Sequence, residues 1–474
     1  MSASDSRRPS LRADIARLVA AHDRPGPRYT SYPTAVEFHP ETQGGVGETE
    51  ARARLELANR RAAEPLSLYL HLPFCAHRCL FCGCNVIITP HKERTLPYLD
   101  LLVREAELVA ALLPDRRALS QLHLGGGTPT YNAPEDLART VRRVLELFPA
   151  RADAELAVEV DPRVTTFEHL DALGALGFNR ISLGVQDFSP AVQAAVERLQ
   201  SVEQTSNVIE HARRRGFRGV NLDLIYGLPF QTPESFEASL RTALSLRPDR
   251  AAVYSYAYVP WKGAHMKDIE PATLPPAELK LELGAIAREL FLGAGYEPIG
   301  MDHYAAPHDE LALAKRAGRL RRNFQGYTVI PASDVIGLGI SSIGDVAGAY
   351  LQNTKKLTEY EQLVAAGHLP IERGVLRSAE DELRRDVIHE LLCNFALDVP
   401  AIERRHAIRF EQHFARDLEL LREEEAQGLV RIGPERIEVT PTGELFVRNL
   451  AMCFDTYWRD KHAGSAKPKF SRTV

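Results

Sequence analysis

The chain has 474 residues, a formal net charge of −5 at pH 7, 45% hydrophobic residues and 26% charged residues. This length allows two or three domains, and these fractions are those of an ordinary globular protein. The small negative charge gives no electrostatic basis for binding nucleic acid or an anionic membrane, and no apolar run is long enough to span a bilayer. We therefore expect a cytoplasmic protein that binds neither nucleic acid nor membrane.

An aromatic and proline-rich segment, HDRPGPRYTSYPTAVEFHP at 22–40, follows a short helical start. It shows neither a helical nor a strand period, so we expect an extended N-terminal arm. A linker is the simpler interpretation of such a segment. The presence of Arg28, Tyr29, Tyr32 and Phe38 together favours a lid or a substrate contact. Both interpretations stay open at this point.

Short apolar runs alternate with amphipathic stretches from Leu66 onward. We predict strands at 66–72, 120–124, 155–160, 180–186, 219–228 and 251–259. We predict helices at 95–113, 134–147, 166–176, 189–215, 233–246 and 277–294. This alternation indicates right-handed βαβ crossovers and a parallel α/β sheet. Six such units favour an open, incomplete (β/α)6 barrel, whose working residues lie at the C-terminal ends of the strands.

The pattern changes after the barrel. We expect strands at 296–301 and 327–331 and a glycine-rich turn at 337–345. We then expect helices at 384–392, 410–427 and 444–458, with a hairpin at 429–441. Helices with a hairpin predict a winged-helix-like C-terminal domain, but it has no basic helix for DNA, so a structural or partner-facing role is favoured. The predicted divisions of the chain are 1–55, 56–375 and 376–474.

Four of the six cysteines follow the first predicted strand within ten positions, at Cys75, Cys79, Cys82 and Cys84. Such a concentration of thiols predicts a soft-metal site. Three ligands in CxxxCxxC spacing leave one iron of a [4Fe–4S] cluster free, because each of the four irons needs one outside ligand. Zinc held by four thiolates, or with His71 or His77, is the alternative. Structural zinc sites usually separate their ligands into two pairs, which disfavours it.

The cysteine segment resembles the radical S-adenosylmethionine (SAM) enzymes in its CxxxCxxC spacing, in its place after the first strand, and in Phe81 before the third cysteine. The resemblance implies a cluster whose open iron binds the amino and carboxylate groups of SAM. One electron then produces a 5′-deoxyadenosyl radical that takes hydrogen from an unactivated carbon. The segment GGGTPT at 125–130 resembles the family's methionine-binding loop, in which glycines leave the backbone open to a ligand.

Further blocks narrow this resemblance. They are GPRYTSYPTA (26–35), YLHLPFCAHRCLFCGCN (69–85), EVDPR (159–163), GVQDF (184–188), DLIYGLP (223–229), MDHYA (301–305), NFQGYT (323–328) and MCFDTY (452–457). Together they resemble the oxygen-independent coproporphyrinogen III dehydrogenases from the arm to the last helix. The resemblance implies an oxidoreductase of heme biosynthesis. Two propionates of coproporphyrinogen III would each lose a β-hydrogen and carbon dioxide to become vinyl groups, giving protoporphyrinogen IX.

The resemblance also implies roles for the residues that match the family's motifs. The implied cluster ligands are Cys75, Cys79 and Cys82. The implied contacts of cluster-bound SAM are Tyr69, Gly126, Glu159 and Ile343, with Tyr69 also counted as catalytic. The implied contacts of a second SAM molecule are Phe81, Gly127, Thr128, Gln186, Arg198, Asp223 and Ala257. Carboxylates suit ammonium and hydroxyl donors, and an arginine can fork a carboxylate. Taken singly, Gln186, Arg198 or Asp223 would equally be expected to bond local backbone.

Cys84 is an additional cysteine that the family has, although three cysteines complete the cluster. We hypothesise a catalytic role in positioning, or in a hydrogen-atom or electron step, with a small packing residue as the alternative. A substrate with four carboxylates also needs cationic partners, for which Arg28 ranks first and Arg321 and Arg322 follow. Tyr258 stands where the family usually has a histidine, which leaves the substrate contacts near it undefined.

Two other functions share much of this pattern. A heme chaperone of the same superfamily binds heme, but it generally lacks the RYTSYP arm and the fourth cysteine. A radical methyltransferase that opens heme shares the cluster and the two-SAM site. For the leading interpretation we expect a monomer that receives electrons from a donor such as flavodoxin or ferredoxin.

Overall fold

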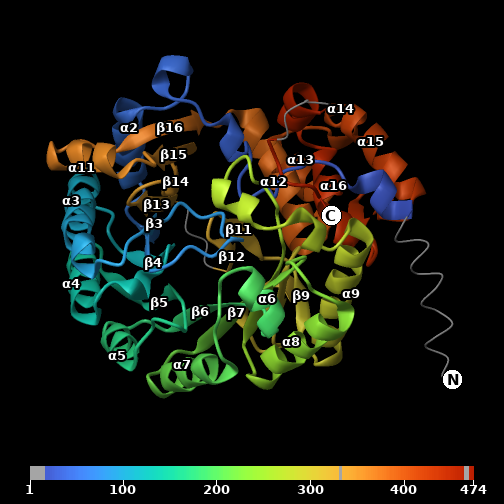
Figure 1. Ribbon diagram of the computed structural model, residues 1–474. Helices are drawn as coiled ribbons and strands as arrows, with labels where there is room; N and C mark the ends of the chain where they lie inside the picture. Colours follow the sequence, from blue (N-terminus) through green and yellow to red (C-terminus); the bar gives the residue numbers. More distant parts are fainter. Residues whose placement is uncertain (1–16, 330–333, 464–468, 474) are drawn as a thin grey trace.

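The computed structural model of the chain describes residues 17–329, 334–463 and 469–473 (Figure 1). Its main feature is a 12-stranded sheet in the order β16-β15-β14-β13-β1-β4-β5-β6-β7-β8-β10-β9. The strand order is open at both ends, so the sheet is not closed into a ring. Among the helices of these described ranges, none has the length and apolar character needed to cross a membrane.

Six neighbouring parallel strands form the barrel: β1 (Leu66–Leu72), β4 (Leu119–Gly126), β5 (Ala150–Val160), β6 (Arg180–Gln186), β7 (Gly219–Tyr226) and β8 (Arg250–Ser255). The outer helices are α3 (Leu96–Leu112), α4 (Pro134–Leu147), α5 (Phe167–Ala175), α6 (Pro190–Ala195), α7 (Val202–Arg214), α8 (Pro233–Ser245) and α9 (Ala277–Gly293). The incomplete (β/α)6 barrel is therefore confirmed. The bounds of β1, β6 and α4 are those predicted from the sequence.

Strand β6 shows why these segments form a barrel wall. In RISLGVQ the residues Ile181, Leu183 and Val185 are buried in the main core, and the residues between them are only partly covered. This period of two sends apolar side chains to the helices and leaves Ser182 and its neighbours for the barrel interior. The sequence pattern thus places polar side chains inside the barrel.

The predicted helix at 189–215 is wrong in one respect, because it is two helices. Helix α6 ends at Ala195, and Glu197 has a left-handed backbone with φ of 55°. Helix α7 starts afresh after Ser201, whose side chain forms a capping box with Gln204. A left-handed residue ends a helix and a capping box begins one. The break leaves Arg198 in a loop at the end of β6.

The sheet extends beyond the barrel on the β1 side. The added strands there are β13 (Asp334–Leu338), β14 (Ile343–Val346), β15 (Ala349–Asn353) and β16 (Ile371–Leu376), and only β13 runs parallel to its neighbour β1. Helices α2 (Glu48–Asn59) and α11 (Leu357–Ala365) lie beside these strands (Figure 1). The predicted turn at 337–345 is therefore the end of β13, a tight turn and the start of β14.

The other side of the sheet ends in shorter pieces. They are β9 (Glu297–Ile299) and β10 (His303–Ala305), followed in the chain by α10 (Glu310–Arg316). The hairpin of β11 (Arg321–Asn323) with β12 (Gly326–Thr328) is a separate two-stranded sheet. A small pair, β2 (Phe74–Cys75) and β3 (Ile87–Ile88), brackets the cysteine segment. The predicted strands at 296–301 and 327–331 are thus β9 and β12, each shorter than expected. Positions 330 and 331 lie outside the described residues.

The C-terminal part is mostly helical, as predicted. It contains α12 (Ala379–Asn394), α13 (Val399–His406), α14 (Phe410–His413), α15 (Ala415–Ala426) and α16 (Val447–Met452). The predicted hairpin is β18 (Val430–Ile432) with β19 (Arg436–Val439), and β17 (Ala396–Asp398) adds a third strand. The single helices predicted at 410–427 and 444–458 are each broken, at Phe414 and after Met452.

The N-terminal arm packs against the C-terminal part. Tyr29 and Tyr32 are buried in one hydrophobic core with residues of α12, α13, α15 and α16. The Tyr29 hydroxyl donates to Asp455 at 2.9 Å, and Arg448 Nε donates to the Pro27 carbonyl at 3.0 Å. The arm is therefore a fixed structural segment and not a free linker. The division of the chain at 55 and 375 stays a prediction.

Candidate active site

The C-terminal ends of β1, β4, β5, β6 and β7 surround a cavity of about 280 Å³. The predicted site residues that line it are Cys75, Cys79, Phe81, Cys82, Cys84, Gly126, Gly127, Thr128, Glu159, Gln186, Arg198 and Asp223. Residues 75 and 223 are far apart in sequence, and the parallel sheet brings them to one edge. Tyr69, Ala257 and Ile343 are not part of this lining.

The cysteine segment forms a tight loop at the cavity wall. The backbone N–H of Cys82 donates to the carbonyl of Cys79 at 3.1 Å. Cys79 is buried, and its Sγ accepts from Arg163 at 3.6 Å and from Arg198 at 3.5 Å. Guanidinium groups beside a thiol favour the thiolate, which is the form that binds metal. The charge environment of Cys79 therefore suits a metal ligand.

The thiols are arranged for a group larger than one ion. Within the part of the chain that the structure describes, no three Cys, His, Asp or Glu side chains converge closely enough to hold a single metal ion. The zinc interpretation thus gains no support from the geometry. In a [4Fe–4S] cluster each thiolate binds a different iron, so the ligands stand farther apart. Cys75, Cys79 and Cys82 lining one cavity fit that requirement.

Cys84 lies directly against one predicted ligand. A hydrogen bond from Cys84 lowers the pKa of the Cys82 thiol to about 6, and the same contact raises the pKa of Cys84. Burial raises the pKa of Cys75 to about 11, against a hydrogen bond with Thr128 at 3.4 Å. Cys84 lines the same cavity as Cys82. Its proposed role in catalysis stays a prediction.

The glycine run after β4 has no room for side chains. A Cβ on Gly126 would lie 2.6 Å from the ring of His71, and Gly126 has φ of +110°. A Cβ on Gly127 would lie 2.5 Å from the carbonyl carbon of Pro73. Only glycine permits this backbone conformation and this close approach to the end of β1. The loop therefore presents its main chain, not side chains, to the cavity.

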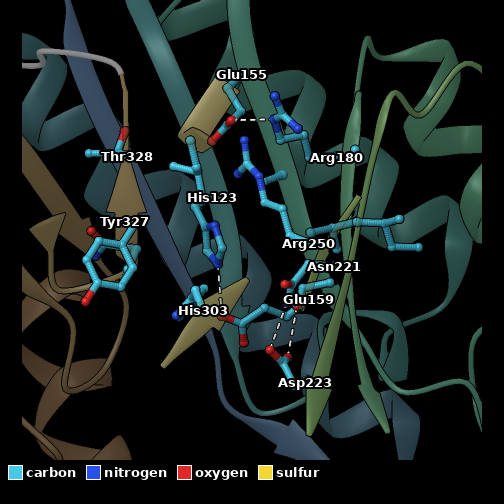
Figure 2. A pocket seen from close by; sticks show the side chains of 18 of the residues that line it. His123, Glu155, Glu159, Arg180, Asn221, Asp223, Arg250, His303, Tyr327 and Thr328 are labelled. Atoms are coloured by element: carbon cyan, nitrogen blue, oxygen red, sulfur yellow. Dashed lines mark hydrogen bonds and ion pairs between the residues drawn. The ribbon is translucent and has the colours of Figure 1, made fainter. Parts of the chain in front are cut away.

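Glu159 is hydrogen-bonded to a histidine that was not among the site residues predicted from the sequence. His123 Nε2 lies 2.9 Å from Glu159 Oε1 (Figure 2). The Gly126 N–H donates to Glu159 Oε2 at 3.4 Å. Burial would raise the pKa of Glu159, but the hydrogen bond and charge of His123 lower it below its usual value. Tyr69 stacks on His123 with ring centroids 5.8 Å apart. Tyr69 thus supports this pair from outside the cavity.

Asp223, the other carboxylate predicted for this site, has neutral hydrogen-bond partners. Its carboxylate accepts from Ser182 Oγ and from Asn221 Nδ2, both at 2.9 Å (Figure 2). Burial, together with the nearby negative charge of Glu159, raises the pKa of Asp223 to about 6. The cavity therefore holds Asp223, whose pKa is raised to about 6, together with Glu159 and Asp161, whose pKa values are lowered by their partners.

Arg198 and Gln186 form the side of the cavity at the end of β6. Arg198 donates to Asp161 at 3.0 Å and to the Gly184 carbonyl at 2.5 Å. Gln186 has a left-handed backbone with φ of 69°, where the register between β6 and β7 shifts. Strained non-glycine residues are concentrated at functional sites. This geometry supports the choice of Gln186 as a site residue.

The remaining two predicted residues lie elsewhere around the barrel. Ile343 begins β14, and its main chain approaches Gly337, which pairs with Tyr69 in the sheet. Ala257 follows β8 in the chain, and its side chain is partly covered. Both therefore stay predictions as cofactor contacts.

A second cavity of about 130 Å³ continues the first one into the barrel interior (Figure 2). The two share Glu159, Ser182, Asp223 and Tyr254, and the inner one also reaches His123 and His303. These two histidines and Arg163 are not among the site residues predicted from the sequence. His123 could have been predicted from its alternation with Gln121 on the inward face of β4. Arg163 could have been predicted because it ends the EVDPR block.

Comparisons with known proteins identify relatives of the whole chain. A sequence model of the radical SAM superfamily matches residues 69–243. The chain is 44% identical to the oxygen-independent coproporphyrinogen III oxidase of Escherichia coli (strain K12), over 97% of this chain and 98% of the relative. It is 38% identical to that of Bradyrhizobium diazoefficiens, over 98% of this chain and 100% of the relative.

A solved structure extends the likeness to the fold. The coproporphyrinogen III oxidase of Escherichia coli, described as a radical SAM enzyme, matches with a TM-score of 0.86 at 44% identity, covering 91% of this chain and 97% of that one. High identity over nearly the whole length, with the same fold, decides the family. The chain belongs to the oxygen-independent coproporphyrinogen III oxidases of the radical SAM superfamily.

Proposed function

We propose that this protein is an oxidoreductase that converts two propionate side chains of coproporphyrinogen III to vinyl groups, giving protoporphyrinogen IX. The observation that carries the proposal is the single cavity that joins the three cysteines to Glu159, Arg198 and Asp223. Full-length similarity to enzymes named for this activity supports it. A heme chaperone is not favoured, because the arm and Cys84 are both present. A heme-opening methyltransferase is not favoured, because the full-length relatives are named as coproporphyrinogen III oxidases.

Different residues have different proposed roles in binding the cofactors. Cys75, Cys79 and Cys82 would hold a [4Fe–4S] cluster, and Glu159 with the open backbone of Gly126 would bind the amino-acid part of SAM. When bound, these cofactors supply the radical that takes a hydrogen atom from the propionate. Phe81, Gly127, Thr128, Gln186, Arg198, Asp223 and Ala257 would surround a second SAM molecule.

The setting of the reaction is also proposed. A reduced flavodoxin or ferredoxin would supply the electron, and the protein would act as a monomer in the cytoplasm without nucleic acid or membrane. The net charge of −5 gives no positive excess that would attract either polyanion.

An anaerobic assay tests the function. Cluster-loaded protein is mixed with dithionite, SAM and coproporphyrinogen III, and the products are identified by mass spectrometry. We expect loss of two carbon dioxide molecules per porphyrinogen and formation of 5′-deoxyadenosine. A Cys79→Ala variant, which lacks a cluster ligand, should form neither product. Stoichiometric heme binding by the wild type with no vinyl product would instead favour the chaperone.

A further inference from the structure

Three arginines meet where the arm, the barrel and the C-terminal part come together. Arg28 Nη2 donates to the Ser255 carbonyl at 2.5 Å, and Arg322 Nη1 donates to the Arg28 carbonyl at 3.0 Å. Arg448 donates through Nε to the Pro27 carbonyl at 3.0 Å. Their oxygen partners here are backbone carbonyls, and Arg322 Nη1 also donates to Met301 Sδ at 3.8 Å. Within residues 17–329, 334–463 and 469–473, none of the three forms an ion pair with a carboxylate.

Arg28 lies at the edge of the barrel formed by the C-terminal ends of its strands. Ser255 is the last residue of β8, and Tyr226 is the last residue of β7. Burial raises the pKa of the Tyr226 hydroxyl, and the nearby charge of Arg28 opposes this rise. The guanidinium of the arm therefore stands beside the strand ends that precede Ala257. Tyr254, the residue before Ser255, lines both cavities, so a ligand group held by Arg28 would lie beside a strand end that borders them.

Arg322 is buried with part of its hydrogen-bonding capacity unused. The residue is 9% exposed, and its Nε is a buried atom with no hydrogen-bond partner. Its guanidinium carbon lies 5.1 Å from the centre of the Tyr327 ring, which lines the inner cavity. A buried donor without a partner costs free energy unless a ligand accepts from it. This N–H donor is therefore available to an anionic group of a ligand.

The surroundings leave a positive excess. Asp302 is the acidic group near Arg28 and Arg322, and it already accepts from His303 Nδ1 at 2.7 Å. Burial would raise the pKa of Asp302, but His303 and the two arginines lower it to about 2. Burial, Arg28 and Arg448 lower the pKa of Lys280 to about 7. Asp302 thus has two arginines, Arg28 and Arg322, close to it, and this pair leaves a local positive charge that attracts a further anion.

We infer that Arg28 and Arg322 bind a propionate carboxylate of the substrate. The inference rests on the proposed function, since coproporphyrinogen III carries four carboxylates. A guanidinium holds a carboxylate through two parallel hydrogen bonds, which fixes orientation as well as affinity. Arg321, the second candidate from the sequence, is not part of this site. Its side chain is 46% exposed and pairs with Glu390 at 3.3 Å.

Binding of coproporphyrin III, the air-stable oxidised form of the substrate, tests the site apart from turnover. Cluster-loaded wild type, Arg28→Ala and Arg322→Lys are titrated with this probe, and its fluorescence gives Kd. We expect Kd to rise about tenfold to a hundredfold in each variant, because one charge-assisted fork is lost. Arg319→Ala, an exposed cation three positions before Arg322, is the matched control and should leave Kd unchanged.

Other measurements separate this site from general damage. In both variants SAM should bind normally, as shown by the EPR signal of the reduced cluster with SAM, and KM for the porphyrinogen should rise more than kcat falls. Arg28→Lys should recover part of the lost affinity, because the charge remains without the fork. Wild-type Kd in Arg28→Ala and Arg322→Lys would overturn the site alone. Absence of porphyrinogen turnover by the wild type would overturn the proposed function, and this site with it.

Discussion

At the scale of single residues, the neighbours of two carboxylates in one cavity shift their pKa values in opposite directions. Glu159 has a histidine partner that lowers its pKa despite burial, whereas neutral partners leave Asp223 with a raised pKa of about 6. Separation of the pKa values of paired groups is a mark of a functional site. At neutral pH Glu159 is therefore ready to receive a cationic ammonium group.

Replacement of His123 tests this division. His123→Leu removes the partner of a buried carboxylate, so the pKa of Glu159 should rise and SAM affinity should fall about tenfold at neutral pH. Because a protonated Glu159 attracts an ammonium group poorly, the loss should grow as pH falls from about 8 to 6. Isothermal titration of the cluster-loaded protein with SAM measures both effects.

The control for that substitution is His211→Leu. His211 also contacts a carboxylate, Asp171 at 2.5 Å, but on the outer helix α7. Its SAM affinity should stay at the wild-type value across the same pH range. A His123→Leu protein with the same affinity and pH profile as His211→Leu would show that Glu159 does not depend on His123.

The limit of sequence-based prediction at this scale is visible in His123 and Glu159. Glu159 was chosen because it matches a family motif, and motif matching carries no information on what orients a side chain. His123 comes within 2.9 Å of it only because β4 and β5 are neighbours in register. Supporting contacts of this kind depend on tertiary structure. The cysteines, by contrast, are predictable because their spacing itself sets their chemistry.

At the scale of elements, one buried glutamate ties helix α3 to the strands beside β1. Glu105 accepts from the Gly339 N–H, the Tyr360 hydroxyl and the Asn353 amide, each at 2.7 Å. Gly339 begins the turn between β13 and β14, and β14 starts at Ile343. Burial raises the pKa of Glu105 to about 7, against these hydrogen bonds. A helix residue thus fixes the turn that carries a predicted cofactor contact.

Glu105→Leu should destabilise the fold strongly. Three buried donors lose their acceptor, so the free energy of unfolding should fall by on the order of 3 kcal/mol or more, measured by urea denaturation. Glu107→Leu, on the same helix and 35% exposed, should cost no more than about 1 kcal/mol. Equal midpoints for the two variants would remove Glu105 from its structural role.

The same pair of variants predicts a pH dependence. The pKa of Glu105 is higher in the folded state, about 7, than its ordinary value of 4.5, so the folded state holds this proton more tightly. Its contribution to stability is therefore greatest below pH 4.5 and falls as pH rises towards about 7. The stability difference between wild type and Glu105→Leu should shrink over that interval.

The elements that could be predicted are those with a clear local sequence pattern. The bounds of α4 follow from Pro134 at its start and a clear apolar stripe, and β6 follows from strict alternation. The break between α6 and α7 was missed because Glu197 is an ordinary helix former that tertiary contacts hold in a left-handed conformation. Strand β13 pairs with β1 across more than half the chain, and no short-range pattern encodes such a pairing.

At the scale of the whole molecule, the arm joins two hydrophobic cores. Tyr29 and Tyr32 are 1% and 0% exposed in the C-terminal core, and Phe38 stacks on Tyr350 of β15 with centroids 5.5 Å apart. Lys461 and His462 also pair with Glu37 of the arm. The barrel and the C-terminal part should therefore unfold as one cooperative unit.

The two tryptophans of the chain, Trp261 and Trp458, can report on the two parts separately. In single-tryptophan variants of the wild type, both should give the same denaturation midpoint. The double substitution Tyr29→Ala and Tyr32→Ala removes about 3–5 kcal/mol of packing per ring. The Trp458 midpoint should then fall below that of Trp261.

A control on the same arm is Thr34→Ala, a half-buried residue whose side chain makes no cap hydrogen bond. It should leave the two midpoints together. Separate midpoints already in the wild type would contradict the coupling of the two cores by the arm.

The contact between the arm and Arg448 has a consequence for synthesis on the ribosome. Arg448 donates to the carbonyl of Gly26, which lies 422 positions earlier in the chain. At roughly 5–20 residues per second, the arm waits about 20 to 85 s for its partner to be translated. The cysteine loop can fold during that time, while Tyr29 and Tyr32 stay without their core. A nascent chain thus has its metal ligands long before Arg28 reaches its place. Arg28 can be positioned only after Arg448 has been translated.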